Sequence, residues 1–255
     1  MGPDGSFAYS QARLQARFGN RLRAGDWHRL QSMRNLASVL QAVRDSPFAA
    51  WTQGLGPSSP AHEIERRLRG GWTGAVDEVS NWQPVQWRPA MQWLRWLVYV
   101  PALQKLARGG RAPDWMRADP VIGPVVALEL QARPGSLART GMAPLAAGFS
   151  DHADVAGAWA NTWRKLWPER ARSTGMDWFI RELGAHYESL RALPASERSE
   201  SLRAEFDGRL QRAFRRNPMS MTAGVAYLGL HALDAIRLRG VLVTQALREP
   251  GRVLS

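Results

Sequence analysis

Apolar residues recur every three or four positions along most of this chain, which places them on one face of an α-helix. Leu14 and Phe18 show this spacing near the start, and Trp159, Trp163 and Trp167 show it in the second half. No segment alternates apolar and polar residues between hairpin turns, as a half-buried β-strand would. The sequence therefore predicts an all-α fold, built from helical hairpins in more than one lobe.

The periodic pattern is interrupted once over a long stretch. Between residues 112 and 150, prolines and glycines separate short apolar pieces, and such punctuation is typical of loops and linkers. We therefore expect an N-terminal helical lobe over residues 1–111, a connecting region over 112–150 and a C-terminal helical lobe over 151–255.

Several local signals predict where helices begin and bend. Asp26 has the side chain of an N-cap, for a helix expected to pack as an antiparallel hairpin on the one before it. Ser59 is placed to cap a helix from Pro60, which Gly70-Gly71 should weaken near its middle. Pro101 should kink or split the helix that begins near residue 89.

The chain is strongly basic, with a formal net charge of +12 over 255 residues. Lys105 and Lys165 are the only lysines among its 34 basic residues, so 32 are arginine, and they are spread along the whole chain. A nucleic-acid footprint usually gathers on one face or loop. An acidic protein partner or an anionic membrane surface is favoured over nucleic acid.

The residue types of known catalytic and metal sites are missing or badly spaced. The absence of cysteine excludes disulfides, thiolate chemistry and cysteine zinc sites, and it favours the cytoplasm. No two of the five histidines are four residues apart, and no phosphate-binding or dinucleotide-binding glycine pattern occurs. Asp151, His152 and Asp154 could imitate a ligand cluster, but acidic residues there are expected to cap a helix. We predict no catalytic residues, no cofactor, no metal, and hence no enzyme.

Twelve tryptophans invite two interpretations. Trp93, Trp96 and the series from Trp159 to Trp167 stand at helical spacing among apolar residues, so we expect them in the core. Three others lie near prolines and are candidates for exposed anchors in an interface; they are Trp82, Trp87 and Trp115.

Two stretches resemble a known family. The first is YSQARLQARFGNRL at residues 9–22, followed later by ERRL at 65–68, and the second is AYLGLHALDAIRLRGVL at 226–242. They resemble the opening and closing helices of the C subunit of V/A-type rotary ATPases, called subunit d in eukaryotes. The closing helix of that family carries an acidic residue followed by Asn-Leu-Arg; here Asp234 is followed by Ile236 or Arg237 in place of the asparagine.

The resemblance implies a non-catalytic adaptor and a fold of helical lobes arranged as a funnel. The chain is shorter than ordinary members, so a lobe is expected to be missing or trimmed. Family members link the central stalk to the membrane rotor ring on its cytoplasmic face, in the transport of protons or sodium ions. We therefore expect central-stalk and rotor-ring subunits as partners and a cytoplasmic location, peripheral to the membrane. The runner-up is a basic helical nucleic-acid-binding protein.

Five arginines and two carboxylates are the candidate site residues. The arginines expected to bind a partner's carboxylates are Arg17, Arg21, Arg237 and Arg239. We further expect Arg13 to be at least half buried and ion-paired with Glu65 or Asp234, because terminal helices often pack together. The alternative is a solvated Arg13 on a basic ridge with Arg17 and Arg21.

Overall fold

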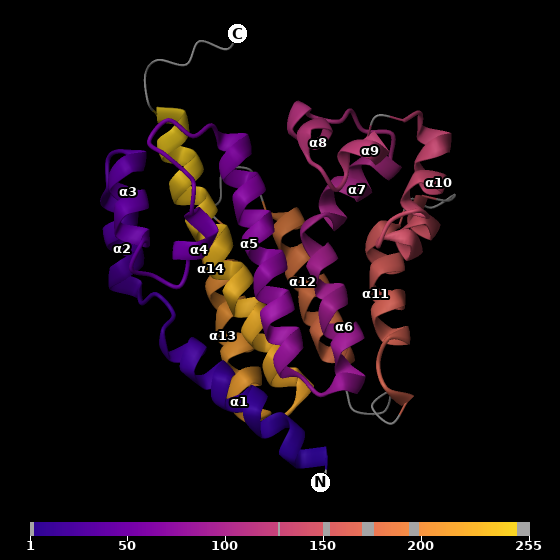
Figure 1. Ribbon diagram of the computed structural model, residues 1–255, viewed down its shortest axis with the longest axis horizontal. Helices are drawn as coiled ribbons and strands as arrows, with labels where there is room; N and C mark the ends of the chain where they lie inside the picture. The colour runs from indigo at the N-terminus through magenta and orange to yellow at the C-terminus, as the bar shows by residue number, and fades with distance from the viewer. Residues whose placement is uncertain (1–2, 127, 150–153, 170–175, 194–198, 249–255) are drawn as a thin grey trace. The chain divides into compact units, whose positions relative to one another are not determined.

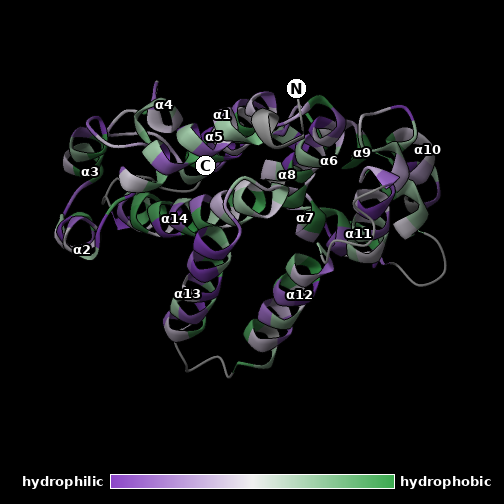
Figure 2. Cartoon of the chain, turned by 90° about the horizontal axis from the view of Figure 1, so that it is seen from below, coloured by the Kyte–Doolittle hydropathy of each residue, from purple (hydrophilic) through white to green (hydrophobic). Residues whose placement is uncertain are grey.

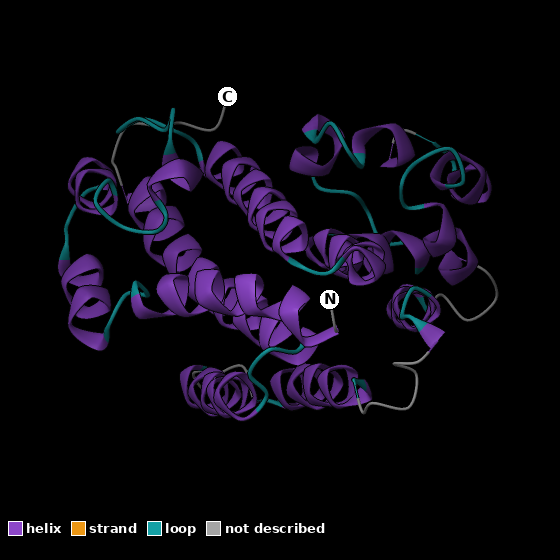
Figure 3. Cartoon of the chain, turned by 60° about the horizontal axis from the view of Figure 1, so that its bottom comes forward, coloured by secondary structure: helices purple, strands orange, loops and turns teal. Residues whose placement is uncertain are grey.

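The computed structural model describes residues 3–126, 128–149, 154–169, 176–193 and 199–248, and it confirms the all-α prediction. Within these ranges the backbone forms helices, turns and loops and no strand (Figure 3). The chain divides into two compact units. Unit 1 combines residues 1–84 with 176–255, and unit 2 is the continuous segment 85–175.

These boundaries differ from the expected lobes at 1–111, 112–150 and 151–255. The difference arises because the last helix, Met221–Arg248, packs on three N-terminal helices as well as on the helix before it. The proline- and glycine-rich stretch is not a linker between lobes: it folds into short helices that belong to unit 2.

Unit 1 is organised around its last helix (Figure 1). α14 packs against α1, α3, α5 and α13, and most of its first fourteen residues are buried. Figure 2 shows α13 as largely hydrophilic beside it. The helices of unit 1 are α1 (Pro3–Gly19), α2 (Ala24–Ser32), α3 (Leu36–Val43), α4 (Ala49–Thr52), α5 (Ala61–Trp82), α12 (Asp177–Ala192), α13 (Glu200–Arg216) and α14 (Met221–Arg248).

Unit 2 has a core rich in tryptophan. The tryptophans at 159 and 163, on α11, and at 167, just after it, are buried as predicted. The Trp93 indole N–H donates a hydrogen bond to the backbone carbonyl of Trp159 at 3.1 Å. Trp87, one of the candidates for an exposed anchor, is also buried. The elements of unit 2 are η1 (Val85–Trp87), α6 (Arg88–Trp93), η2 (Leu94–Val98), α7 (Val100–Ala107), α8 (Asp114–Ala118), α9 (Gly123–Val126), η3 (Leu130–Ala132), α10 (Arg133–Leu137), η4 (Ala143–Phe149) and α11 (Val155–Lys165).

The local signals were only partly right. Asp26 is not the N-cap of α2 but lies inside its first turn, where its carboxylate accepts from the backbone N–H of Arg23 at 2.9 Å. Helix α2 ends at Ser32, and α3 begins anew with Asn35 as its cap. α1 packs on α5 and α14, not as a hairpin on α2.

Helix α5 runs unbroken through Gly70-Gly71, and Pro60 is its N-cap residue. The hydroxyl of Ser59, expected to cap this helix, instead accepts from the N–H of Gly56 in the preceding loop. Pro101 was predicted to kink or split its helix, and a new helix, α7, does begin immediately before it, at Val100.

Candidate functional site

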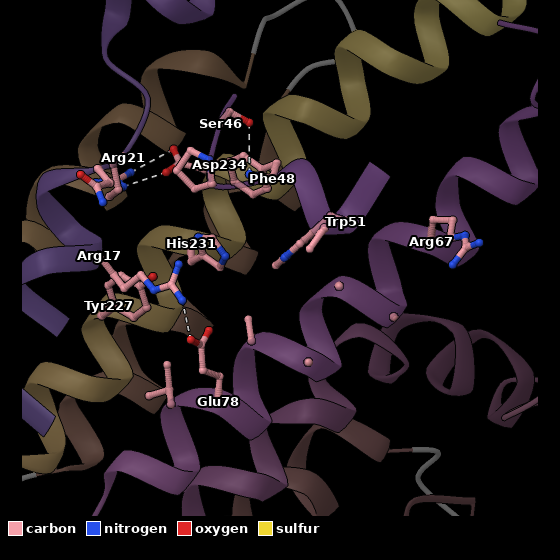
Figure 4. A pocket seen from close by; sticks show the side chains of 18 of the residues that line it. Arg17, Arg21, Ser46, Phe48, Trp51, Arg67, Glu78, Tyr227, His231 and Asp234 are labelled. Atoms are coloured by element: carbon pink, nitrogen blue, oxygen red, sulfur yellow. Dashed lines mark hydrogen bonds and ion pairs between the residues drawn. The ribbon is translucent and has the colours of Figure 1, made fainter. Parts of the chain in front are cut away.

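A pocket of about 1000 Å³ opens within unit 1 between α1, α4, α5, α14 and the turn before α4 (Figure 4). We call it the α5 pocket, because one face of α5 forms a long side of it. Its lining residues are Arg17, Asn20, Arg21, Asp45, Ser46, Pro47, Phe48, Ala50, Trp51, Arg66, Arg67, Gly70, Gly71, Gly74, Ala75, Glu78, Val79, Tyr227, His231 and Asp234.

The α5 side of the pocket is open because its residues are small. A Cβ added at Gly70 or Gly74 would meet no atom within 4 Å, so bare helix backbone faces the pocket there. At Gly71 a Cβ would lie 2.3 Å from the Trp51 ring. Gly71 therefore permits α4 to approach α5 closely, whereas Gly70 and Gly74 leave empty space.

Arg21 binds two carboxylates at the α14 side of the pocket. Its Nε donates to Asp234 at 2.7 Å, and its Nη2 donates to Asp234 at 3.0 Å and to Asp207 at 2.8 Å. Burial opposes the charge of Arg21, but the hydrogen bonds and charges of Asp234 and Asp207 outweigh burial and raise its pKa above its ordinary value. Burial raises the pKa of Asp234, and the Arg21 guanidinium opposes that rise. This cluster ties α13 and α14 to the segment that follows α1.

Arg17 lies across the pocket and donates to Glu78 of α5 at 2.5 Å. Both side chains are about half exposed, at 49% and 45%. An exposed pair of this kind contributes at most about 1 kcal/mol. Arg17 can therefore exchange Glu78 for another carboxylate at little energetic cost.

An aromatic cluster forms the base of the pocket around His231 of α14. The rings of Phe48 and Tyr227 lie parallel to the imidazole, with centroids at 5.1 and 5.7 Å, and Trp51 meets it edge-on at 4.9 Å. Burial, with the charges of Arg21 and Arg17, lowers the pKa of His231 to about 4. Burial likewise raises the pKa of Tyr227 to about 12. At neutral pH both are uncharged groups that can form hydrogen bonds.

The structure brings only two of the four predicted partner-binding arginines together. Arg17 and Arg21 line the α5 pocket. Arg237 lies over the Trp27 ring, 5.9 Å from its centroid, and Arg239 pairs with Glu65 of α5. Arg237 and Arg239 are not lining residues of the pocket.

The predicted burial and pairing of Arg13 were wrong. Its side chain is exposed and lies 5.3 Å from the Tyr9 ring centroid, while Leu14 takes the buried position. Glu65 and Asp234 do form ion pairs with arginine, but with Arg239 and Arg21. Arg21 rather than Arg13 pairs with Asp234, because the chain leaves α1 after Gly19 and turns toward α14.

Sequence reasoning missed His231, Tyr227 and the open glycine face. Three glycines within five residues of one helix, Gly70, Gly71 and Gly74, were the available signal. Glycine lowers helix stability by about 1 kcal/mol relative to alanine, so such a cluster indicates close packing or a binding surface.

The described residues contain no group of three His, Asp or Glu side chains placed to hold a metal ion. Asp154 caps α11 by accepting from the Gly157 N–H at 2.8 Å, as predicted; Asp151 and His152 lie outside the described residues. No helix in the described part of the chain is long and apolar enough to cross a bilayer. The α5 pocket offers guanidinium groups, neutral hydrogen-bonding groups and open backbone, a set suited to binding acidic groups.

In comparisons with known proteins, the sequence matches no protein-family model and no curated protein.

Proposed function

We propose that this protein is a non-catalytic adaptor, similar to the C subunit of V/A-type rotary ATPases, that links an acidic central-stalk subunit to a membrane rotor ring. The single observation that carries the proposal is the contact between the two family-like segments. Arg21, in the opening segment, binds Asp234, the acidic residue of the closing segment.

The contact supports the proposal because the two segments that resemble the family are more than 200 positions apart in sequence and yet form one ion-paired unit. Their helices, α1 and α14, also pack directly together. A chance resemblance at two distant places would not require the segments to form one structural unit.

The charge of the α5 pocket supports an acidic partner. Four arginines line it against three carboxylates; Arg21 is paired with Asp234 and Arg17 with Glu78, which leaves Arg66 and Arg67 against Asp45. Arginine forms bidentate hydrogen bonds with carboxylates, which makes such a surface specific as well as attractive. Unlike charges also accelerate association at low salt.

The test is association with the central-stalk and rotor-ring subunits of a V/A-type ATPase from the same organism, by co-purification and by a binding titration. Arg17→Glu is the pocket variant, and Arg13→Glu is its matched control on the same helix. We expect the wild-type chain to bind the stalk subunit, Arg17→Glu to bind on the order of tenfold more weakly, and Arg13→Glu to remain near wild type.

Failure of the wild-type chain to bind either subunit would contradict the proposal. Tight binding of oligonucleotides, lost steeply as salt is added, would favour the nucleic-acid alternative, because phosphate contacts release counterions.

A further inference from the structure

Two polar side chains at the base of the α5 pocket have unused hydrogen-bonding capacity. Tyr227 and His231 are only 5% and 6% exposed, and both line the pocket (Figure 4). No hydrogen bond between described side chains involves the Tyr227 hydroxyl or the His231 imidazole, and neither is among the buried polar atoms that lack a partner, so both are open to solvent in the pocket. Because aromatic neighbours cover the rings elsewhere, the pocket is the direction from which a partner group can reach them.

The adjoining face of α5 is shaped to receive an elongated object. Pocket-lining residues extend from Arg66 to Val79, and thirteen positions (79 − 66) of helix span about 20 Å at ~1.5 Å per residue. Between these ends lie Gly70 and Gly74, whose missing side chains expose backbone to empty space. Small residues at such spacing allow a second helix to approach closely.

Positive charge lies at both ends of this face. Arg67 stands at one end, where its guanidinium packs beside Gly54, and Arg17 reaches the other end through Glu78. A helix with a carboxylate near each end of a three-turn segment would match both guanidinium groups. A compact anion would match only one of them.

We propose that the α5 pocket seats a single α-helix of the acidic partner, laid along Gly70 and Gly74, with its carboxylates on Arg17 and Arg67 and a side-chain oxygen on His231 or Tyr227. This assignment rests on the proposed function, because it names the place where the stalk subunit binds. It differs from the sequence-based expectation, which included Arg237 and Arg239.

A substitution that fills the α5 pocket tests the proposal. Gly74→Leu places a bulky side chain in open space, so the fold is expected to persist while the helix-binding surface is blocked. Gly184→Leu is the matched control, because Gly184 is an exposed glycine of α12 with no atom within 4 Å of its added Cβ. Binding to the central-stalk subunit and thermal unfolding are measured for both variants.

We expect Gly74→Leu to weaken stalk binding on the order of tenfold or more, while Gly184→Leu binds like wild type. Both variants should unfold at or above the wild-type temperature, because leucine favours helix over glycine. Unchanged stalk binding by Gly74→Leu would contradict the binding of a helix in the α5 pocket, but it would not contradict the adaptor function. Absence of wild-type binding to the stalk would overturn both.

A second pair of variants tests the hydrogen bonds. Tyr227→Phe removes only the hydroxyl, and His231→Phe removes the ring nitrogens while keeping an aromatic, somewhat larger ring, so each should weaken stalk binding about fivefold, the effect of one lost hydrogen bond. Full affinity in both variants would overturn the contact. Binding of a single-stranded oligonucleotide that Gly74→Leu abolishes, with stalk binding intact, would identify a different occupant and also overturn the proposal.

Discussion

Arg21 and Asp234, 213 positions apart in sequence, are joined by two hydrogen bonds of 2.7 and 3.0 Å. The Asp234 side chain is only 2% exposed and that of Arg21 13%. The pair is therefore deeply buried, and it connects the segment after α1 to the middle of α14.

Removing Arg21 should destabilise the fold strongly. Arg21→Ala leaves the Asp234 carboxylate buried without its partner, which typically lowers the free energy of unfolding by about 3–5 kcal/mol. Arg13→Ala, on an exposed position of α1, should change it by less than about 0.5 kcal/mol. Urea denaturation followed by circular dichroism compares the two. Equal stability of the variants would show that the buried pair has no structural importance.

Two adjacent glycines of α5 should respond in opposite directions to the same substitution. Gly71→Ala forces a Cβ to within 2.3 Å of the Trp51 ring, and overpacking of this kind costs about 1–3 kcal/mol. Gly70→Ala meets no atom within 4 Å and should stabilise the helix by up to about 1 kcal/mol. Thermal unfolding of the two variants is the measurement. A stabilised Gly71→Ala would disprove the close approach of α4 to α5.

His231 should make the protein less stable in acid. Burial, followed by the charges of Arg21 and Arg17, lowers its pKa from 6.5 to about 4. The unfolded chain therefore binds the proton more readily, and the free energy of unfolding falls as pH falls from about 6.5 to about 4. A shift of about 2.5 pKa units corresponds to about 3 kcal/mol.

The His231→Phe variant isolates this contribution, because the other titrating groups remain. The difference in unfolding free energy between wild type and variant should change across this pH range and level off below about pH 4. A difference that does not vary with pH would show that His231 titrates alike in both states.

Met219 should be replaceable with a gain in stability. It is the only described non-glycine residue with a positive φ, at 52°, and half of its side chain is exposed. A left-handed backbone costs a side chain-bearing residue about 1–2 kcal/mol, which glycine avoids. Met219→Gly should raise the midpoint of urea denaturation. Met221→Gly, at a buried helical position nearby, should lower it.

The helices were predictable because their signals are local. The spacing of Trp159, Trp163 and Trp167 is sufficient to place them on one buried face, and Pro101 marks a helix start from its ring geometry alone. The break between α2 and α3 was not predictable in this way, because Met33 continues the apolar spacing through a loop.

The α5 pocket could not be predicted from the sequence, because it is formed by long-range contacts that the spacing of residues does not reveal. Arg13, Arg17 and Arg21 are four residues apart and look equivalent in sequence. Their environments diverge because α1 ends at Gly19, so Arg21 turns toward Asp234 while Arg13 stays in solvent. His231 lies at the base of the pocket because Phe48 and Trp51, nearly two hundred positions earlier in the sequence, pack around its ring.

The interrupted course of unit 1 has a consequence for synthesis on the ribosome. Unit 2 is continuous, so its contacts can form as soon as residues 85–175 have emerged. The N-terminal helices of unit 1 must wait for α14, the helix against which α1, α3 and α5 pack, and which is translated last among the described elements. The nascent chain thus carries the surfaces of α1, α3 and α5 that pack on α14 uncovered through most of its elongation, a state in which chaperones protect proteins from aggregation.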